Sequence, residues 1–433
     1  MTLVPVDAPV ASGGPSLWRN RAYMSLLTGE TISAVGVQVA QVAMPIIAVT
    51  YLAASEMQVG VLGAVPGLAF LALSLPVGAW VDRVSRRGVM VAANLVRSAV
   101  MATVPLLWWL GVLEMTGLVV AALALSAAQV FFDMSYMSMV PSLVRREQLD
   151  DANARLQITA ETARAAGPGL GGLLAKALAA PLLTLAATVG YLASAIAIWR
   201  IPRDVPPPRR EARLIGEMRE GVSFVLRNIY IRPVVVSATV SNLFATLGMT
   251  MVPVLLLREL EMSATAYGLL LSCGSLGGIL GAVSAPWFGR RFGQGHAIPV
   301  TYLIGGIAFF AMPLALHVPR AAAIALIGAG ELVVVFSIVA FNVVQVSMRQ
   351  RQCPPRMIGR MTASIRTLMW GVGPLGALGA GVLATHLGLA ATFWIAAVGN
   401  LAGIALLVRS PLWRLRTVPD PAWLTDPAHA SSP

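Results

Sequence analysis

The sequence predicts an all-α membrane protein, and three observations support this fold class. Hydrophobic residues make up 57% of the 433-residue chain and charged residues 12%, and the mean hydropathy is +0.77. These values lie far from those of an ordinary soluble domain. A membrane crossing needs about 20 apolar residues. Twelve such stretches are present: 23–51, 59–81, 89–110, 117–140, 153–175, 181–199, 233–257, 264–288, 298–316, 321–346, 361–383 and 389–408. Backbone groups in hydrocarbon must be hydrogen-bonded within their own segment, so crossings of this length are helices.

The positions of the basic residues predict the orientation. Of the 31 Lys and Arg residues, 24 fall in tails and loops on the side of both termini, 4 within crossings and 3 on the opposite side. The side rich in Lys and Arg is the cytoplasmic side. We therefore expect both termini in the cytoplasm and a multi-pass protein of the bacterial inner membrane. The net charge of +12 follows from this orientation and from contact with anionic membrane lipids, so nucleic acid is not an expected partner.

The chain repeats itself at an offset of 208 residues. Identical residues at this offset are Arg19 and Arg227, Asn20 and Asn228, Thr31 and Thr239, Ser33 and Ser241, Pro45 and Pro253, Gly60 and Gly268, and Pro105 and Pro313. We therefore expect homologous six-helix halves at 19–200 and 232–410. A Pro- and Arg-rich cytoplasmic linker, 201–231, joins them and contains an amphipathic helix that should lie on the inner membrane surface. Residues 1–18 and 411–433 are expected to be flexible cytoplasmic tails. Parallel halves of this kind occur in transporters whose halves rock against each other.

A compact loop of opposite charges joins the second and third predicted crossings. Its glycine and charged residues are Gly78, Asp82, Arg83, Arg86 and Arg87. The loop resembles the Gly-x-x-x-Asp-Arg-x-Gly-Arg-Arg signature of the major facilitator superfamily, with Ser85 at the second Gly. This resemblance implies a cytoplasmic latch that stabilises the outward-open state and breaks as the halves rock. It also implies that Asp133, toward the inner end of the fourth crossing, completes the latch, with proton carriage as the alternative. For the loop as a whole, the alternative is a positive patch that only sets the topology.

The fifth predicted crossing contains a second motif. Gly167, Pro168, Gly171 and Gly172 resemble the Gly-Pro-x-x-Gly-Gly core of a motif associated with exporters of the superfamily. This resemblance implies export. Small residues also let helices approach closely, and a proline kinks a helix, so simple packing is the alternative.

Polar side chains form stripes on four crossings. At roughly 100° per residue, polar residues of the first, fourth, seventh and tenth crossings each gather on one side of their helix. A polar residue is not expected to face lipid. The stripes therefore predict a substrate cavity, whose candidate residues are Gln38, Gln41, Gln129, Tyr136, Asn242, Asn342 and Gln345. The superfamily resemblance implies that the same four crossings line the central cavity.

Ionisable residues inside crossings are costly and usually have a function. Glu30 and Glu331 lie on the predicted stripes without an evident partner in their own helix. Burial without a partner favours the neutral form of a carboxyl group, so these two are the proton-coupling candidates, with a permanently hydrogen-bonded carboxyl as the alternative. Glu161 and Arg164 are three residues apart and can form a buried pair, either structural or part of a substrate or proton path. For Arg97, on the third crossing, we expect a structural partner or a side chain that reaches toward the membrane surface.

No nucleotide, metal or other cofactor is expected. The only lysine, Lys176, is followed by Ala177, so the chain has no P-loop and its energy must come from a gradient. No histidine lies deep in a predicted crossing, which leaves carboxylates for proton chemistry. The predicted outer loops are too short to form a catalytic domain, so we expect a transporter and not an enzyme.

Three segments indicate which branch of the superfamily the chain resembles. Residues 149–174, 341–361 and 220–228 look like those of the twelve-span branch of the superfamily that contains macrolide-efflux proteins and the enterobactin exporter. The resemblance implies a monomeric multidrug efflux antiporter that exchanges protons for amphipathic, drug-like or siderophore-like small molecules. A lipid or lysolipid flippase on the same scaffold is the alternative. A non-transporting membrane scaffold is a third hypothesis, which the short outer loops and the polar stripes disfavour.

Overall fold

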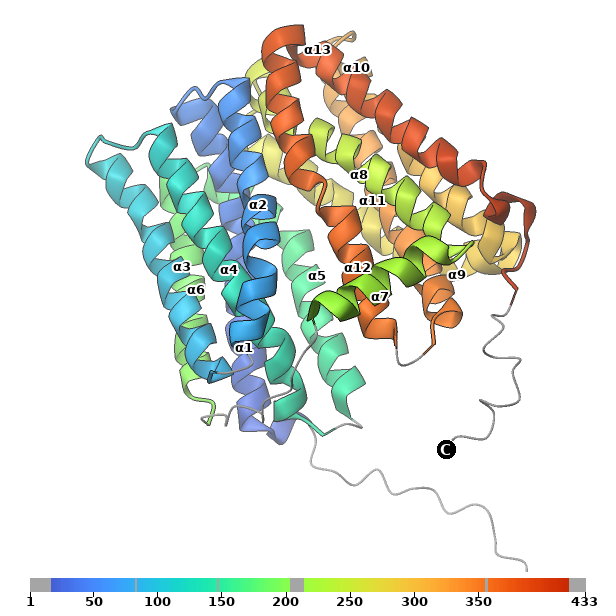
Figure 1. The fold of residues 1–433 in the computed structure, drawn as a ribbon. Coiled ribbons are helices and arrows are strands. Elements are labelled where there is room, and N and C mark those ends of the chain that lie inside the picture. The colour runs from blue at the N-terminus through green and yellow to red at the C-terminus, as the bar shows by residue number, and fades with distance from the viewer. Residues whose placement is uncertain (1–16, 82–83, 146–147, 203–213, 355–356, 420–433) are drawn as a thin grey trace, which may run out of the picture.

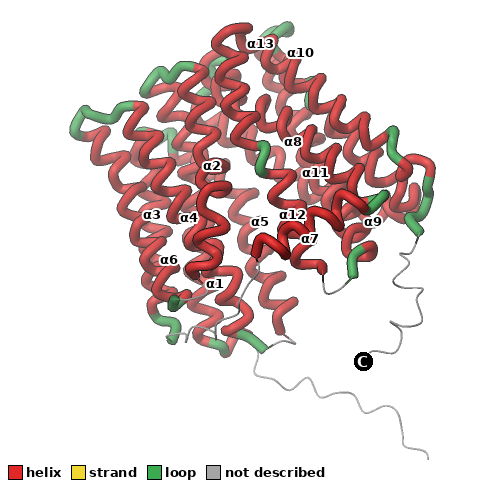
Figure 2. Tube along the Cα trace, viewed as in Figure 1, coloured by secondary structure: helices red, strands yellow, loops and turns green. Residues whose placement is uncertain are grey.

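The computed structural model describes residues 17–81, 84–145, 148–202, 214–354 and 357–419. Within these ranges the regular elements are all helices, and no strand is present (Figure 2). The α-helices are α1 (Arg21–Ile46), α2 (Glu56–Val81), α3 (Arg86–Trp109), α4 (Met115–Leu143), α5 (Leu149–Leu174), α6 (Ala180–Trp199), α7 (Leu214–Arg227), α8 (Ile231–Val254), α9 (Ala264–Ala308), α10 (Ala311–Ala315), α11 (Arg320–Gln352), α12 (Ile358–Trp370) and α13 (Gly373–Val408).

Nine helical segments of the described chain are long and apolar enough to cross a membrane. Two of them are unusually long, with 52 residues in Ala264–Ala315 and 51 in Ile358–Val408. Each contains a glycine with a positive φ, 75° at Gly293 and 82° at Gly388, a conformation that glycine adopts far more readily than other residues. In Figure 1, α13 is drawn as two arms that meet at the upper end of the molecule. The glycines thus divide each long segment into two helical arms.

The helices form two bundles, which lie side by side in Figure 1. In the first bundle α1 packs against α5 and α6, and α3 packs against α4 and α6. In the second bundle α9 packs against α11, and α8 packs against α13. The bundles meet along two seams, one between α2 and α13 and one between α5 and α9.

Local geometry recurs in the two bundles at the offset of the sequence repeat. The side-chain oxygen of Asn20 accepts a hydrogen bond from the Tyr23 amide at 3.1 Å and caps α1. That of Asn228, the residue at the same place in the repeat, accepts one from the Ile231 amide, the first residue of α8, at 2.9 Å. Both helices end in a π-helical turn, η2 (Ile47–Tyr51) and η4 (Leu255–Glu259). Ala53 and Glu261 then have φ values of 46° and 45°, which are uncommon outside glycine. Because η2 and η4 contact each other, we call this end of the molecule the closed end.

The opposite end carries α7, and we call it the linker end (Figure 1). The predicted amphipathic linker helix forms, but its apolar face packs against α12. Val225 is fully buried in a cluster with Met361 and Ile365. A Cβ added at Gly221 would lie 2.7 Å from the Arg360 carbonyl oxygen, and Arg360 Nη1 donates to Glu220 Oε2 at 2.6 Å. The helix therefore rests on the second bundle, and this face is not free to lie on lipid as the sequence predicts.

Candidate functional site

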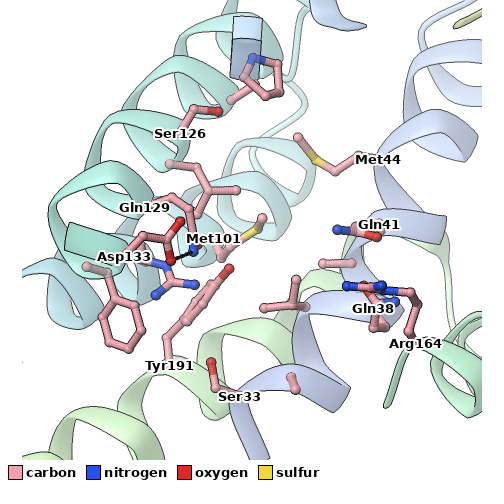
Figure 3. A pocket seen from close by; sticks show the side chains of 18 of the residues that line it. Ser33, Gln38, Gln41, Met44, Met101, Ser126, Gln129, Asp133, Arg164 and Tyr191 are labelled. Atoms are coloured by element: carbon pink, nitrogen blue, oxygen red, sulfur yellow. Dashed lines mark hydrogen bonds between the residues drawn. The ribbon is translucent and has the colours of Figure 1, made fainter. Parts of the chain in front are cut away.

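A cavity of about 950 Å³ lies mostly within the first bundle, and we call it the first cavity. Residues of α1, α2, α4 and α5 form most of its wall, with others from α3, α6 and α8. Figure 3 shows polar side chains on several sides of this space, between apolar ones such as Met44 and Met101. Volumes of this size and walls of this kind are typical of sites for drug-sized molecules.

One part of the first cavity gathers charges from three helices. Glu30 of α1, Arg97 of α3 and Asp133 of α4 all line it. Asp133 Oδ1 accepts a hydrogen bond from Gln129 Nε2 at 2.7 Å, the dashed line in Figure 3. The guanidinium of Arg97 acts electrostatically on both carboxyl groups. The wall therefore holds two acids that share one buried cation.

Arg97 combines an expected and an unexpected feature. As predicted, it has a structural partner, because Nη1 donates to Asn94 Oδ1 at 2.8 Å. However, its side chain is only 3% exposed and lines the cavity, so it does not reach for the membrane surface. The guanidinium carbon lies 3.9 Å from the centre of the Tyr191 ring and 4.8 Å from that of Phe132, which are cation–π contacts. The polar residues Asn94, Arg97 and Ser98 share one face of α3, a stripe from which this inward orientation could have been predicted.

The predicted substrate residues divide between two cavities. The first cavity is lined by Gln38, Gln41, Gln129 and Tyr136. A second cavity, of about 490 Å³, lies in the second bundle and is lined by residues that include Asn242 and Asn342. Met249 and Thr250 of α8 line both, so the two spaces adjoin. Gln345 is 1% exposed and lines neither, but its Nε2 donates to Asn342 Oδ1 at 3.0 Å. It therefore acts on the second cavity only through Asn342.

Glu331 lies outside both linings, which differs from its predicted place on a cavity stripe. Its Cγ and Oε1 are each 3.1 Å from the position that a Cβ would take at Gly274 of α9. Glu331 and Asn342 share one face of α11, but α9 covers that face at the level of Glu331. A Cβ at Gly277 would lie 2.9 Å from the Leu332 carbonyl carbon, so the glycines of α9 permit this close approach. Helix packing therefore turns Glu331 toward a neighbouring helix.

The predicted pair of Glu161 and Arg164 forms, with 3.0 Å between Oε1 and Nη1. The prediction that it is buried is wrong, because the two side chains are 50% and 66% exposed. Gln157 Nε2 also donates to Glu161 Oε1 at 2.8 Å. In Figure 3, Arg164 lies beside Gln38 at the edge of the cavity. Arg164 lies seven residues before Gly171 and therefore on the same side of α5, but it borders the first cavity, which leaves the pair exposed. An exposed pair contributes little to stability.

The motif of the fifth predicted crossing joins the two bundles. A Cβ at Gly167 would lie 3.1 Å from Gln38 Cγ, and one at Gly171 would lie 3.3 Å from Val39 Cα, so these glycines face α1. A Cβ at Gly172 would lie 3.0 Å from Gly268 Cα of α9. Pro168 lies between these glycines inside α5. The small residues thus let α5 approach α1 in its own bundle and α9 in the other.

An ion pair joins the bundles at the closed end. Arg258 Nη1 of η4 donates to Glu56 Oε1 of α2 at 2.9 Å, and Arg258 also donates to the Ala54 carbonyl oxygen. In the same seam, a Cβ at Gly60 would lie 2.8 Å from Gly381 Cα of α13. The sequence repeat relates this contact to the one in the other seam. Gly60 corresponds to Gly268 at an offset of 208 residues, and Gly172 corresponds to Gly381 at an offset of 209 residues. The two seams are therefore built alike.

The predicted latch lies only partly within the described chain. Asp82 and Arg83 lie outside the described residues, whereas Gly78 belongs to α2 and Arg86 and Arg87 begin α3. Arg87 donates to the carbonyl oxygen of Trp199, and its guanidinium carbon lies 5.9 Å from the centre of that ring. Asp133 lines the first cavity. The latch, including the role assigned to Asp133, stays a prediction.

Comparison with protein families identifies the chain. Residues 13–424 match the family described as transmembrane secretion effector, a family of the major facilitator superfamily. The chain belongs to this family. The superfamily membership predicted from the charged loop and the fifth crossing is thereby confirmed, and the protein is an integral membrane protein.

Two relatives of this protein are named multidrug efflux pump Tap. The protein of Mycolicibacterium fortuitum is 28% identical over 342 residues, which cover 75% of this chain and 80% of the relative. That of Mycobacterium tuberculosis (strain ATCC 25618 / H37Rv) is 27% identical over 371 residues, which cover 82% of this chain and 86% of the relative. Both alignments span most of each chain.

Solved structures show the same fold at low identity. A bacterial homologue of the iron transporter ferroportin, in an inward-facing state, has a TM-score of 0.74 and 17% identity, covering 91% of this chain and 99% of that chain. The nucleoside transporter NupG has a TM-score of 0.65 and 12% identity, with coverage of 91% and 99%. The chain therefore has the fold of these solved transporters.

Proposed function

We propose that this protein is a secondary active exporter of amphipathic, drug-like or siderophore-like molecules, driven by proton antiport through alternating access. Twelve crossings follow if α5 is counted and the long segments of α9 and α13 each contribute two arms. In this topology the linker end faces the cytoplasm of a bacterium, as the basic loops predict. The protein works as a monomer, because each chain has both bundles and the cavity between its helices.

The observation that carries this proposal is the charged wall of the first cavity. Glu30 and Asp133 line a space of about 950 Å³ that also has apolar and aromatic surfaces. Carboxyl groups in such a position can take up a proton on one side of the membrane and release it on the other. The name of the Tap relatives, multidrug efflux pump, supports the export direction and a broad substrate range.

The bundles would move about their seams. In the present state the closed end is held by the Glu56–Arg258 ion pair and by the glycine contacts. We infer that the cavity exchanges with the cytoplasm in this state. Release of the closed end and closure of the linker end would carry substrate outward, with the latch around Asp82 holding the outward-open state. Glu30 is the first proton-coupling residue and Glu331 the second, since Glu331 lines neither cavity.

Transport by everted membrane vesicles tests the proposal. An inside-acid gradient should drive accumulation of at least one compound from a panel of macrolides and siderophores, and Glu30→Gln should remove it. A fluorescent lysolipid in the same assay tests the flippase alternative, which predicts transfer without a pH gradient. If the gradient drives no accumulation of any compound and Glu30→Gln changes nothing, proton-coupled export is wrong.

A further inference from the structure

We propose that Arg97, Asn94 and Ser194 form a one-way hydrogen-bond chain that holds Glu30 ionised when the cavity has the present shape. This inference deepens the proposed proton coupling and rests on it for its role in transport. The three residues are positioning residues for Glu30, because they act on its carboxyl group through a series of hydrogen bonds and not through a direct contact with substrate. Together they would decide when Glu30 releases its proton.

The chain runs through three helices of the first bundle. Arg97 Nη1 of α3 donates to Asn94 Oδ1 at 2.8 Å, and Asn94 Nδ2 donates to Ser194 Oγ of α6 at 2.9 Å. Ser194 Oγ in turn donates to Glu30 Oε1 of α1 at 3.4 Å. The last distance is longer than that of an ordinary hydroxyl hydrogen bond, so this link is the weakest one. The carboxyl group is thus connected to a guanidinium that lies on another helix.

The chemistry of each member sets the direction of the chain. An arginine side chain can only donate hydrogen bonds, so Asn94 must present its oxygen to Arg97. The amide nitrogen of Asn94 then faces Ser194 and donates to it. Since Ser194 accepts from Asn94, its single hydroxyl proton is available for Glu30. A carboxylate accepts such a bond from either oxygen, whereas the protonated oxygen of a carboxylic acid is itself a donor. The chain therefore favours the charged form of Glu30.

The burial of the hydrogen-bond chain strengthens this preference in the present state. Asn94 and Ser194 are 0% exposed and Arg97 is 3% exposed, so these side chains have little contact with solvent. Arginine stays charged at all physiological pH values, and the rings of Tyr191 and Phe132 flank its guanidinium. A buried charge of this kind requires partners. Arg97 obtains them from Asn94, from the two rings and from the nearby acids.

Other groups near Glu30 do not replace the chain. Asp133 of α4 opposes the negative charge of Glu30, and Tyr136 of the same helix and Arg164 of α5 line the same cavity. Asp133 is hydrogen-bonded instead by the neutral Gln129. Among the described residues of this wall, the buried cation Arg97 is thus linked by hydrogen bonds to one of the two acids, Glu30. We expect Glu30 to stay ionised at a lower pH than it would without this link.

A neighbouring bond on the same helices provides a matched control. Ser98 Oγ of α3 donates to the Thr188 carbonyl oxygen of α6 at 2.9 Å. This bond joins the same two helices about one turn from Asn94, but it does not lead to Glu30. Ser98→Ala should therefore reproduce any loss of packing between α3 and α6 without changing the ionisation of Glu30.

The test is the pH dependence of carbodiimide labelling in the purified, detergent-solubilised protein. Dicyclohexylcarbodiimide reacts with protonated carboxyl groups, and mass spectrometry of the peptides measures labelling at Glu30 and at Asp133 separately. Ser194→Ala should move the midpoint for Glu30 to higher pH by about one half to one unit, the size expected for one net hydrogen bond. Arg97→Gln, which keeps an amide donor but removes the charge, should move it further. Ser98→Ala should leave it unchanged.

An unchanged labelling midpoint for Glu30 in Ser194→Ala, or an equal shift in Ser98→Ala, would contradict the proposed hydrogen-bond chain. The labelling needs no substrate and no gradient, so its result is independent of the vesicle assay. If the midpoint moves as expected but vesicles show no proton-driven transport, the hydrogen-bond chain is supported and the proposed antiport is wrong. If vesicles show proton-driven transport while the midpoint does not move, the antiport is supported and the proposed hydrogen-bond chain is wrong.

Discussion

The two bundles resemble each other at their seams and differ in their cavity walls. The wall of the first cavity contains Glu30, Asp133 and Arg97, whereas the second cavity is lined by neutral residues that include Asn242 and Asn342. At the seams, in contrast, both contacts pair one glycine with another. A duplicated scaffold thus keeps the surfaces on which its halves move, while its interior surfaces diverge. The difference suggests that the first bundle handles protons and the second contributes mainly to substrate contacts.

The link between the first and last helices of each bundle shows the same divergence. In the first bundle Ser194 of α6 donates to the carboxyl group of Glu30 on α1. In the second bundle Asn400 of α13 donates to Ser241 of α8, at 2.8 Å to Oγ and 3.1 Å to the carbonyl oxygen. The positions are comparable, but the second link contains no ionisable group. Only the first can respond to pH through its own members.

The largest effect is expected where the bundles are alike. Gly268→Ala adds a Cβ that would lie 2.7 Å from Gly172 Cα, and Gly60→Ala adds one 2.8 Å from Gly381 Cα. Backbone atoms cannot move aside cheaply, so either substitution should reduce transport in vesicles by about a hundredfold or more. The control is Gly328→Ala, because no atom lies within 4 Å of the added Cβ. Unequal effects at the two seams would contradict their equivalence.

A large effect specific to the first bundle is expected at Glu30. Glu30→Gln keeps the size of the side chain and removes its titration, so gradient-driven accumulation should fall by roughly tenfold or more. Glu331→Gln should cost less, because Glu331 lines neither cavity. Uptake by vesicles under an inside-acid gradient measures both variants, with membrane levels compared by immunoblot. An equal or greater loss for Glu331→Gln would mean that the second bundle carries the proton.

An intermediate effect is expected at the closed end. Arg258→Gln removes the ion pair with Glu56 and should shift the protein toward states in which this end is open, which slows transport by about threefold to tenfold. Cysteine accessibility at Val49, which lines the first cavity next to this end, measures the opening. The exchanged pair Glu56→Arg with Arg258→Glu should restore part of the activity. If Arg258→Gln leaves accessibility unchanged, the pair is not a gate.

The smallest effect is expected in the neutral wall. Asn342→Ala should raise the substrate concentration for half-maximal transport by about twofold to fivefold, because one polar contact is lost. The pH profile should not change, since no ionisable group is removed. Transport measured across a pH series separates the two outcomes. A shifted pH profile in Asn342→Ala would contradict the proposal that the first bundle handles protons and the second contributes mainly to substrate contacts.

Hydropathy and helical periodicity determined much of this architecture from the sequence alone. Long apolar stretches must become helices because their backbone groups have no other partners in lipid. Gln38, Gln41 and Gln129 line the first cavity, a placement that follows from polar residues on one helical face avoiding lipid. The charged loop and the glycines of α5 identified the superfamily, since such residues recur for reasons of local geometry. All of these features are read within one helix or one loop.

Contacts between helices were decided only by the tertiary structure. Glu331 and Asn342 share one face of α11. Helix α9 covers this face at Glu331, whereas Asn342 lines the second cavity. Arg97 faces inward, where it donates a hydrogen bond to Asn94 and makes cation–π contacts with two aromatic rings. Glu161 and Arg164 are exposed because this part of α5 borders the open space of the first cavity, which Arg164 lines. The sequence thus determined which segments are helices and which of their faces are polar. Helix–helix packing decided which polar residues meet, because that depends on residues far apart in the chain.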